Sequence, residues 1–525
     1  GTLIEWYDFY IFGSLSTIIA AKFFPSENPT AALLSTLATF AAGFIVRPFG
    51  ALVFGRIGDM IGRKYTFLLT LVLMGISTFL IGLVPSYASI GALAPILVLI
   101  LRLVQGLALG GEYGGAATYV AEHSPIHKRG FYTSWIQTTA TLGLFLSLSV
   151  ILLTRNIVGV EEFEQGNGWR YPFLLSILLV VVSIIIRLKM KESPLFAKLK
   201  SEGKTSVNPL KESFGNKLNF KLVLLALFGG IMGQGVIWYT SQFYAQTFLE
   251  TKCNIEFEQS RMIILWAIVL ATPFFVFFGW LSDKVGRKWI MLTGMLLGVL
   301  TYRPIFDQFL KDSDAMEWMK TLPGYSEKLG VRELEDPVFN KKMADFLSAG
   351  NKITFYIKHA DSSRGKDTVI YRNTYQWSLK NGLKFDENRE DTVIIKNHGL
   401  DSNAYVSGNQ KATTFTNKIL PKYLEWKFIF LVWLLIIFVT MVYGPVAAFL
   451  VELFPTRIRY TSMSLPYHIG NGVFGGLVPF IATLITTLPG TTPLSGLWYP
   501  ILVAGLCFII GALYLSNKVD EDVTD

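Results

Sequence analysis

Charged side chains occur inside long apolar stretches in the first half of the chain. They are Glu5, Asp8, Arg47, Arg102 and Glu112. A charge inside a membrane-spanning segment is costly, so it usually marks a binding site or an ion pathway. With a helical rise of about 1.5 Å per residue, four of the five, Arg102 excepted, fall at a similar depth. An arginine among carboxylates lets one acid stay ionised while another binds a proton. The pattern predicts a proton-coupling group; the alternative is a permanent ion-pair brace.

Two other side chains in apolar stretches are candidates for ligand contact. Arg102 lies nearer the opposite end of its segment than the group above. Its planar guanidinium can hold a carboxylate through parallel hydrogen bonds, or it can bond to neighbouring backbone carbonyls. His468, near the start of a later stretch, could carry a proton or contact a substrate. The alternative is a hydrogen-bonded structural histidine.

A third group of candidates lies on one helix face. Gln234, Trp238 and Gln242 recur at helical spacing in an apolar stretch, and Tyr239 lies beside them. Residues four apart share a helix face, so this pattern predicts a polar and aromatic stripe that lines a cavity. The alternative is aromatic packing without ligand contact.

Two motifs are each repeated between apolar stretches. Residues 55–64, GRIGDMIGRK, match residues 279–288, GWLSDKVGRK, at five identical positions and a separation of 224 residues. The pattern E-x-x-P-x-x-x-R occurs at 122–129 and again 330 residues later at 452–459. Such doubling is typical of a transporter with two related halves. The two separations differ by 106 residues, so the second half contains an insertion of that length.

The repeated loops predict a gate between the halves. An aspartate at a helix terminus can cap backbone N–H groups, and the basic residues can bond the last carbonyls of helices or a glutamate across the halves. The alternative is that the basic residues only set membrane orientation. The gate candidates are Asp59, Arg63, Lys64, Glu122, Arg129, Asp283, Arg287, Lys288, Glu452, Arg457 and Arg459.

The composition indicates a membrane protein. Hydrophobic residues make up 51% of the 525 residues and charged residues 16%, against about 25% charged in a soluble domain. A span needs about 20 apolar residues, and the chain has twelve candidates in two sets of six. They are about 3–24, 31–55, 65–84, 93–120, 131–153, 171–188, 220–248, 261–281, 289–307, 427–451, 462–487 and 497–516.

Lys and Arg are distributed unequally between the two sets of loops. Nineteen lie in the loops that carry the repeats and in the 6–7 connection, and five in the opposite short loops. Because cytoplasmic loops are enriched in these residues, both chain ends are expected in the cytoplasm. The predicted division is a first half 1–188, a basic linker 189–219, a second half 220–307 and 425–516, an extracytoplasmic insert 308–424, and a tail 517–525. Gly1 is not an initiator methionine, so a short upstream segment is expected.

The insert is polar and reads as a small α+β decoration. Runs at 352–357 and 391–395 alternate as strands do, and 314–347 looks mostly helical. It carries no nucleophile triad, no metal-ligand cluster and no phosphate loop, so we expect no enzyme, no metal and no cofactor.

Several motifs together resemble the major facilitator superfamily, and more specifically its metabolite:proton symporters. They are EWYDFY at 5–10, RPFG at 47–50, RLVQG at 102–106, GGEYGGA at 110–116, EHSP at 122–125, KRG at 128–130, GWRYPF at 168–173, WYT at 238–240 and FPTRIRY at 454–460. The resemblance covers all twelve spans but does not explain the insert. It implies the twelve-helix fold, a proton-coupling role for Arg102 and binding residues around Trp238. Tyr113, within GGEYGGA, joins the substrate and proton candidates.

These observations lead to a functional hypothesis. We expect proton-coupled uptake of a small organic acid or zwitterion, in the cytoplasmic membrane of a bacterium, by a protein that acts as a monomer. The proton is the only coupling ion expected, and nucleic acid is not expected as a partner. The alternative is a membrane sensor that uses the insert as its ligand-binding or partner-binding domain.

Overall fold

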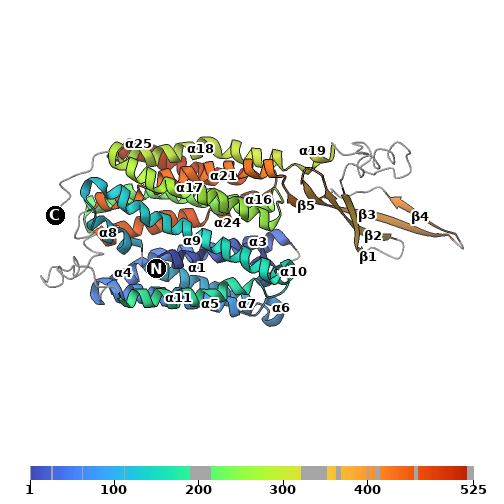
Figure 1. The fold of residues 1–525 in the computed structure, drawn as a ribbon, viewed down its shortest axis with the longest axis horizontal. Helices are drawn as coiled ribbons and strands as arrows, with labels where there is room; N and C mark the ends of the chain where they lie inside the picture. The colour runs from blue at the N-terminus through green and yellow to red at the C-terminus, as the bar shows by residue number, and fades with distance from the viewer. Residues whose placement is uncertain are drawn as a thin grey trace. The chain divides into compact units, whose positions relative to one another are not determined.

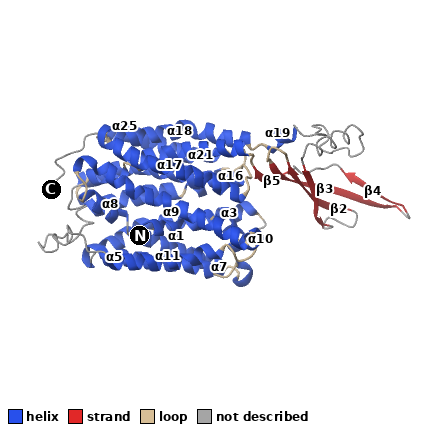
Figure 2. Ribbon diagram, in the orientation of Figure 1, coloured by secondary structure: helices blue, strands red, loops and turns tan. Residues whose placement is uncertain are grey.

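The chain folds into a helical body and a small antiparallel sheet (Figures 1 and 2). This computed structural model describes residues 2–24, 28–61, 63–111, 113–189, 215–320, 352–361, 368–398, 401–407, 414–454 and 459–516. The chain forms two compact units. The first contains Gly1–Ala245, Ile264–Arg303 and Val432–Asp525, and the second contains Gln246–Ile263 and Pro304–Leu431.

Helices from the first half of the chain pack together within the first unit (Figure 1). They are α1 Thr2–Ser14, α2 Ser16–Phe23, α3 Pro29–Ile45, α4 Arg47–Ile61, α5 Arg63–Leu83, α6 Tyr87–Ile90, α7 Leu93–Leu109, α8 Tyr113–Glu122, α9 Arg129–Val158, α10 Val160–Glu164 and α11 Arg170–Lys189. Helix α1 packs on α9, and α5 packs on both α7 and α11. Asn28 starts α3 by accepting bonds from the N–H groups of Thr30 and Ala31, as an N-cap side chain does.

The second half of the chain is also helical, with three π-helical turns among its described residues. Its helices are α14 Lys217–Ala226, α15 Met232–Tyr239, α16 Ala245–Thr251, α17 Phe257–Val285, α18 Arg287–Asp312, α19 Ala315–Lys320, α21 Lys422–Tyr443, α22 Val446–Leu453, α23 Arg459–Tyr467, α24 Val478–Ile485 and α25 Trp498–Tyr514. The π-helical turns are η2 Leu227–Ile231, η3 Thr240–Tyr244 and η4 His468–Gly475. Such turns are rare and frequently occur at functional sites.

Eight helices in the described part of the chain are long and apolar enough to cross a membrane, and three shorter apolar helices accompany them. These eleven overlap predicted spans 2 to 12. The first predicted span is divided between α1 and α2, which have 13 and 8 residues, so neither reaches a spanning length alone. The count of twelve therefore stays a prediction.

The second unit contains a five-stranded antiparallel sheet. Its strands are β1 Lys352–Asp361, β2 Thr368–Ser378, β3 Lys384–His398, β4 Asp401–Ser407 and β5 Thr414–Ile419. They are ordered β1-β2-β3-β4, and β5 also pairs with β3. A small core of Trp377, Leu383 and Phe385 forms on one face, and the Trp377 Nε1–H donates to Glu387 at 2.9 Å. The predicted strands are thus present, whereas the predicted helix is described only as α19; residues 321–347 lie outside the described residues.

The end of the insert is bonded to the loop between α16 and α17, all within the second unit. Ile255 and Lys418 form a parallel bridge, and the Gln259 side chain bonds both the carbonyl and the N–H of Leu420, at 2.9 and 2.6 Å. The Lys418 Nζ donates to the Ser313 carbonyl at 2.6 Å. Burial lowers the pKa of the Lys418 ammonium, because it loses water. These contacts, which we name the foot of the insert, show that residues 418–420 are part of the packed structure.

The foot divides the insert into a part that should be removable and a part that should not. Replacing residues 321–413 by a short Gly/Ser linker should leave thermal stability in detergent nearly unchanged, since closing a surface loop costs only about (3/2)RT ln n. Replacing residues 312–420 should lower the stability, because each buried polar group left unpaired costs about 1–3 kcal/mol. Equal unfolding temperatures for the two deletions would contradict this assignment.

Candidate functional site

Arg47 lies at the centre of a buried aromatic cluster. It begins α4 and is 1% exposed. Its guanidinium carbon lies 4.1 Å from the ring centroid of Phe44 and 4.4 Å from that of Phe9. Its Nε and Nη2 have no hydrogen-bond partner among the described residues. Buried donors are normally paired, so this arginine is suited to hold an acceptor group of a ligand.

The opposite wall comes from α15 and η3. Gln234, Trp238, Tyr239 and Gln242 are all buried. The Gln234 carbonyl oxygen, the Trp238 indole nitrogen and both amide atoms of Gln242 lack partners within the described chain. The predicted stripe on this helix therefore carries several unbonded polar atoms, which is the pattern expected of a ligand-binding wall.

Aromatic rings join the two walls. Tyr10 of α1 stacks on Trp238 with centroids 5.3 Å apart, and Phe44 of α3 meets Tyr239 edge-on at 5.0 Å. Phe40 and Phe243 approach to 5.4 Å. Aromatic packing, the alternative for this stripe, thus occurs here together with the unbonded polar atoms. Tyr10 is not among the site residues predicted from the sequence, although it lies one helical turn from Trp6, on whose ring it stacks.

Arg102 is fixed within the first half. Its Nη1 donates to Gln105 at 2.7 Å and to the Phe9 carbonyl at 3.4 Å. Gln105 in turn donates to the Thr78 hydroxyl at 2.7 Å. The carbonyl contact is the alternative foreseen for this arginine. Its Nε and Nη2 nevertheless have no partner in the described chain, so it retains donors for a ligand.

Asp8 is fully buried and is not paired with Arg47. Neither carboxylate oxygen has a hydrogen-bond partner among the described residues. Trp6 and Phe9, which contact Arg47, share one face of α1, whereas Asp8 is rotated by about 100° from Phe9. The expected arginine–carboxylate cluster is therefore not formed by these two residues. The Glu5 side chain and Glu112 lie outside the described residues.

A second set of contacts joins the halves through the repeated loop of the second half. The Asp283 carboxylate of α17 accepts bonds from the N–H groups of Gly130 and Phe131, both at 2.8 Å. These residues open α9, so Asp283 caps that helix from the other half, the role predicted for it. A Cβ on Gly130 would collide with the carbonyl oxygen of Gly279, so the two helices approach at backbone distance.

The basic residues of this loop stay within the second half. Arg287 bonds Asp283 at 2.6 Å and Glu452 at 2.9 Å. Lys288 donates to the carbonyls of Ala512 and Leu515 at the end of α25, at 2.9 and 2.7 Å. The bond to helix-end carbonyls was expected, but the Arg287–Glu452 pair does not cross between halves. Loop sequence gives no information on which neighbouring helix a long side chain reaches.

Other gate candidates are less fully described. Arg129 begins α9 and is half-buried. The structure does not describe Arg457 or the side chains of Asp59, Arg63, Lys64, Glu122 and Arg459.

Tyr113 and His468 both contact the ring of Tyr467. The Tyr113 ring stacks on Tyr467 with centroids 3.5 Å apart, and its hydroxyl accepts a bond from Gln137 at 2.7 Å. His468 is buried, with its ring edge-on to Tyr467 at 5.3 Å. Sequence reasoning missed Tyr467 and Gln137, because no short-range spacing connects them to Tyr113.

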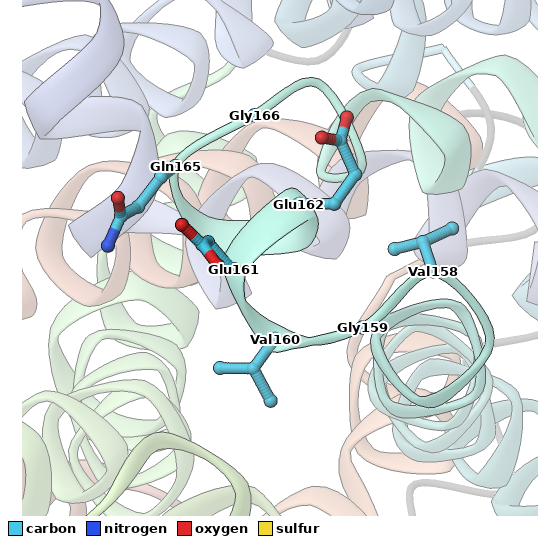
Figure 3. A pocket seen from close by; sticks show the side chains of 7 residues that line it. All are labelled: Val158, Gly159, Val160, Glu161, Glu162, Gln165 and Gly166. Carbon is cyan, nitrogen blue, oxygen red and sulfur yellow. The ribbon is translucent and has the colours of Figure 1, made fainter.

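Two other features carry no site. An open pocket at the turn around α10 is lined by Val158, Gly159, Val160, Glu161, Glu162, Gln165 and Gly166. Figure 3 shows its two glutamates on different sides of the turn, and Glu162 already accepts a bond from the Asn167 N–H. In the ranges that the structure describes, no group of three or more His, Cys, Asp or Glu side chains could hold a metal ion.

Comparison with known proteins gives the family. A family model described as sugar (and other) transporter matches residues 1–221. The shikimate transporter of Escherichia coli is 35% identical over 310 residues, which cover 58% of this chain and 70% of that protein. The chain belongs to the metabolite transporters of the major facilitator superfamily. The predicted resemblance is thereby confirmed.

Other relatives align with different shares of this chain. The proline/betaine transporter of Salmonella typhimurium is 35% identical over 309 residues, covering 56% of this chain and 60% of that protein. A putative metabolite transport protein of Haemophilus influenzae is 29% identical over 525 residues, covering 99% and 93%. The chain spans 60% to 66% of the first relatives it matches. A solved xylose transporter of E. coli has a TM-score of 0.60 at 15% identity, covering 99% of this chain and 96% of that one, which establishes the fold.

The Asp283 contact should hold the two halves together where α17 ends and α9 begins. Asp283→Asn removes the charge that favours the start of α9, so separation of the halves should become easier by about 1–3 kcal/mol, the usual coupling range. A cysteine introduced at His468 should then react faster with a thiol reagent. Asp307→Asn, at an exposed ion pair with Lys311, is the matched control. An unchanged labelling rate would reduce the motif to an orientation signal.

Proposed function

We propose that this chain is a secondary active transporter that takes up a small carboxylate-bearing metabolite together with a proton, by alternating access. The observation that carries the proposal is Asp8, a fully buried acid whose two oxygens have no partner among the described residues. Burying an unpaired ionised carboxylate costs far more than burying a neutral carboxylic acid. Asp8 therefore holds a proton in this conformation and releases it in one that admits water.

The substrate's carboxylate is assigned to Arg47. Its unbonded Nε–H and Nη2–H lie in the fork geometry that suits a carboxylate. The aromatic rings of Tyr10, Trp238 and Tyr239 supply apolar walls, and Gln234 and Gln242 supply amide groups for polar substituents. A cationic end, where the substrate is a zwitterion, could pack on an aromatic face.

The membrane arrangement follows from the charge pattern. Twelve spans in two halves place the chain ends and the linker 189–219 in the cytoplasm and the insert outside, in the cytoplasmic membrane of a bacterium. The halves are 1–188 and 220–307 with 425–516, and the insert is 308–424. The transporter functions as a monomer in the bilayer, with the proton as its coupling ion and with neither a cofactor nor nucleic acid as partner.

The names of the relatives supply the first substrates to test. Shikimate, proline and glycine betaine each appear in the name of a relative, and each carries a carboxylate. Purified protein should be screened for ligand-dependent thermal stabilisation with these three compounds, since a ligand that binds the folded state raises its stability.

Asp8→Asn should abolish proton-driven accumulation. The amide cannot cycle a proton, so in proteoliposomes with an imposed pH gradient the internal substrate should only reach the external concentration. Exchange of labelled for unlabelled substrate should continue. Accumulation at the wild-type level would remove Asp8 from the mechanism. Wild-type protein that binds ligand without accumulating it would favour the membrane-sensor alternative.

Arg47→Lys should weaken substrate binding while leaving the fold intact. The loss of a paired, charge-assisted contact is about 1.5–3 kcal/mol, equivalent to a rise of about 10- to 150-fold in the KM for uptake. Arg303→Lys is the control, because Arg303 packs on the Trp498 ring at 4.8 Å, away from this site. A KM that does not change would show that the carboxylate binds elsewhere.

A further inference from the structure

Two tyrosines from opposite halves of the helical body face each other. Tyr113 opens α8 and Tyr467 ends α23, and both are buried. Their ring centroids lie 3.5 Å apart and their planes differ by 3°. A face-to-face sandwich is not the geometry that an isolated aromatic pair prefers. The surroundings must therefore hold the two rings in place.

Each ring is held from within its own half. The Tyr113 hydroxyl accepts a bond from Gln137 of α9 at 2.7 Å. The Tyr467 hydroxyl is 2.7 Å from the Tyr443 hydroxyl and accepts a bond from Asn471 at 3.2 Å. Among the bonds that the described residues make to these two hydroxyls, none crosses between the halves. The rings can thus separate without breaking them, whereas separation at Asp283 breaks two charge-assisted bonds.

The pair lies between the candidate binding wall and the Asp283 contact. On one side, Gln137 is two helical turns along α9 from Gly130, which Asp283 caps. On the other side, Asn471 accepts a bond from the Gln234 amide at 3.5 Å. A path of hydrogen bonds therefore runs from Tyr467 through Asn471 to Gln234 on the binding wall.

We propose that the Tyr113–Tyr467 ring pair is the inner gate of the binding site, and that Asn471 transmits ligand binding at Gln234 to this gate. The inference rests on the proposed transport function and names the residues that would close the inner side of the binding site. A ligand that bonds the free Gln234 oxygen competes for the amide that contacts Asn471. Asn471 then changes its hold on the Tyr467 hydroxyl, and the ring pair opens or closes with occupancy.

Cysteine labelling tests the gate without needing a substrate. A cysteine at His468 is treated with a membrane-permeant maleimide, and Cys253 and Cys507 give little background because both are buried. Tyr113→Ala and Tyr467→Ala should each raise the labelling rate about two- to tenfold, the range of an aromatic pair interaction. Tyr113→Phe keeps the ring but loses the bond from Gln137, so its labelling rate should lie between those of the wild type and Tyr113→Ala. Tyr132→Ala, at an exposed tyrosine of α9, is the control.

Ligand addition tests the role of Asn471. In protein with Asn471 intact, shikimate or glycine betaine, whichever stabilises the protein, should change the labelling rate at position 468. Asn471→Ala should bind the same ligand, seen as thermal stabilisation, but show no such change. Ligand-dependent labelling that persists in Asn471→Ala would overturn the transmission step.

Cross-linking tests whether the pair must part during transport. Tyr113→Cys with Tyr467→Cys, joined through two disulfides by a bis-methanethiosulfonate reagent, should stop exchange, and reduction of the disulfides should restore it. Exchange that continues while the link is intact would overturn the gate. So would Ala variants that are stable but label at the wild-type rate. Neither result depends on a proton gradient, so failure of the gate is distinct from failure of proton coupling.

Discussion

The two halves of this protein are joined where a carboxylate of one half caps a helix of the other. Asp283 accepts two backbone N–H bonds from the start of α9, and these N–H groups have no partner within α9 itself. In a low-dielectric environment such groups cannot be left unbonded without a large cost. The contact therefore aligns α9 with α17, and the close approach at Gly130 and Gly279 follows from that alignment.

The candidate site has more hydrogen-bond donors than its neighbouring acceptors satisfy. Arg47 and Trp238 present unbonded N–H groups in a region walled by aromatic rings, while Asp8 is buried on a different face of α1. In the proposed function, substrate and proton are thus held by different residues. Coupling between them then depends on movement of α1, which carries both Asp8 and the rings that contact Arg47.

Sequence reasoning found most of the helical elements, but not the direction in which the charged side chains leave each helix. The repeated motif indicated that Asp283 would cap a helix, because a carboxylate can accept hydrogen bonds from the unpaired N–H groups at a helix N-terminus. It did not indicate that Asp8 and Arg47 would be unpaired with each other. Apolar residues lie on every face of the segment from Glu5 to Tyr10, so its hydrophobic pattern does not tell which face turns toward Arg47. The Tyr113–Tyr467 pair was missed because contacts between helices distant in the chain leave no local pattern. The strands of the insert were predicted, whereas its bonded foot was not, because the Gln259–Leu420 and Lys418–Ser313 bonds join residues more than 100 positions apart.

The foot of the insert also explains how a transport body can accommodate a large addition. Lys418 of β5 bonds the Ser313 carbonyl, and Lys427 of α21 pairs with Asp312 at 2.7 Å, so β5 and α21 are both bonded to the end of α18. The two points at which the insert joins α18 and α21 are therefore held close together by these bonds. A segment whose own ends lie close together could replace the upper part of the insert without breaking these bonds. This loop is therefore a natural position for evolution, or for an experimenter, to exchange one exposed module for another.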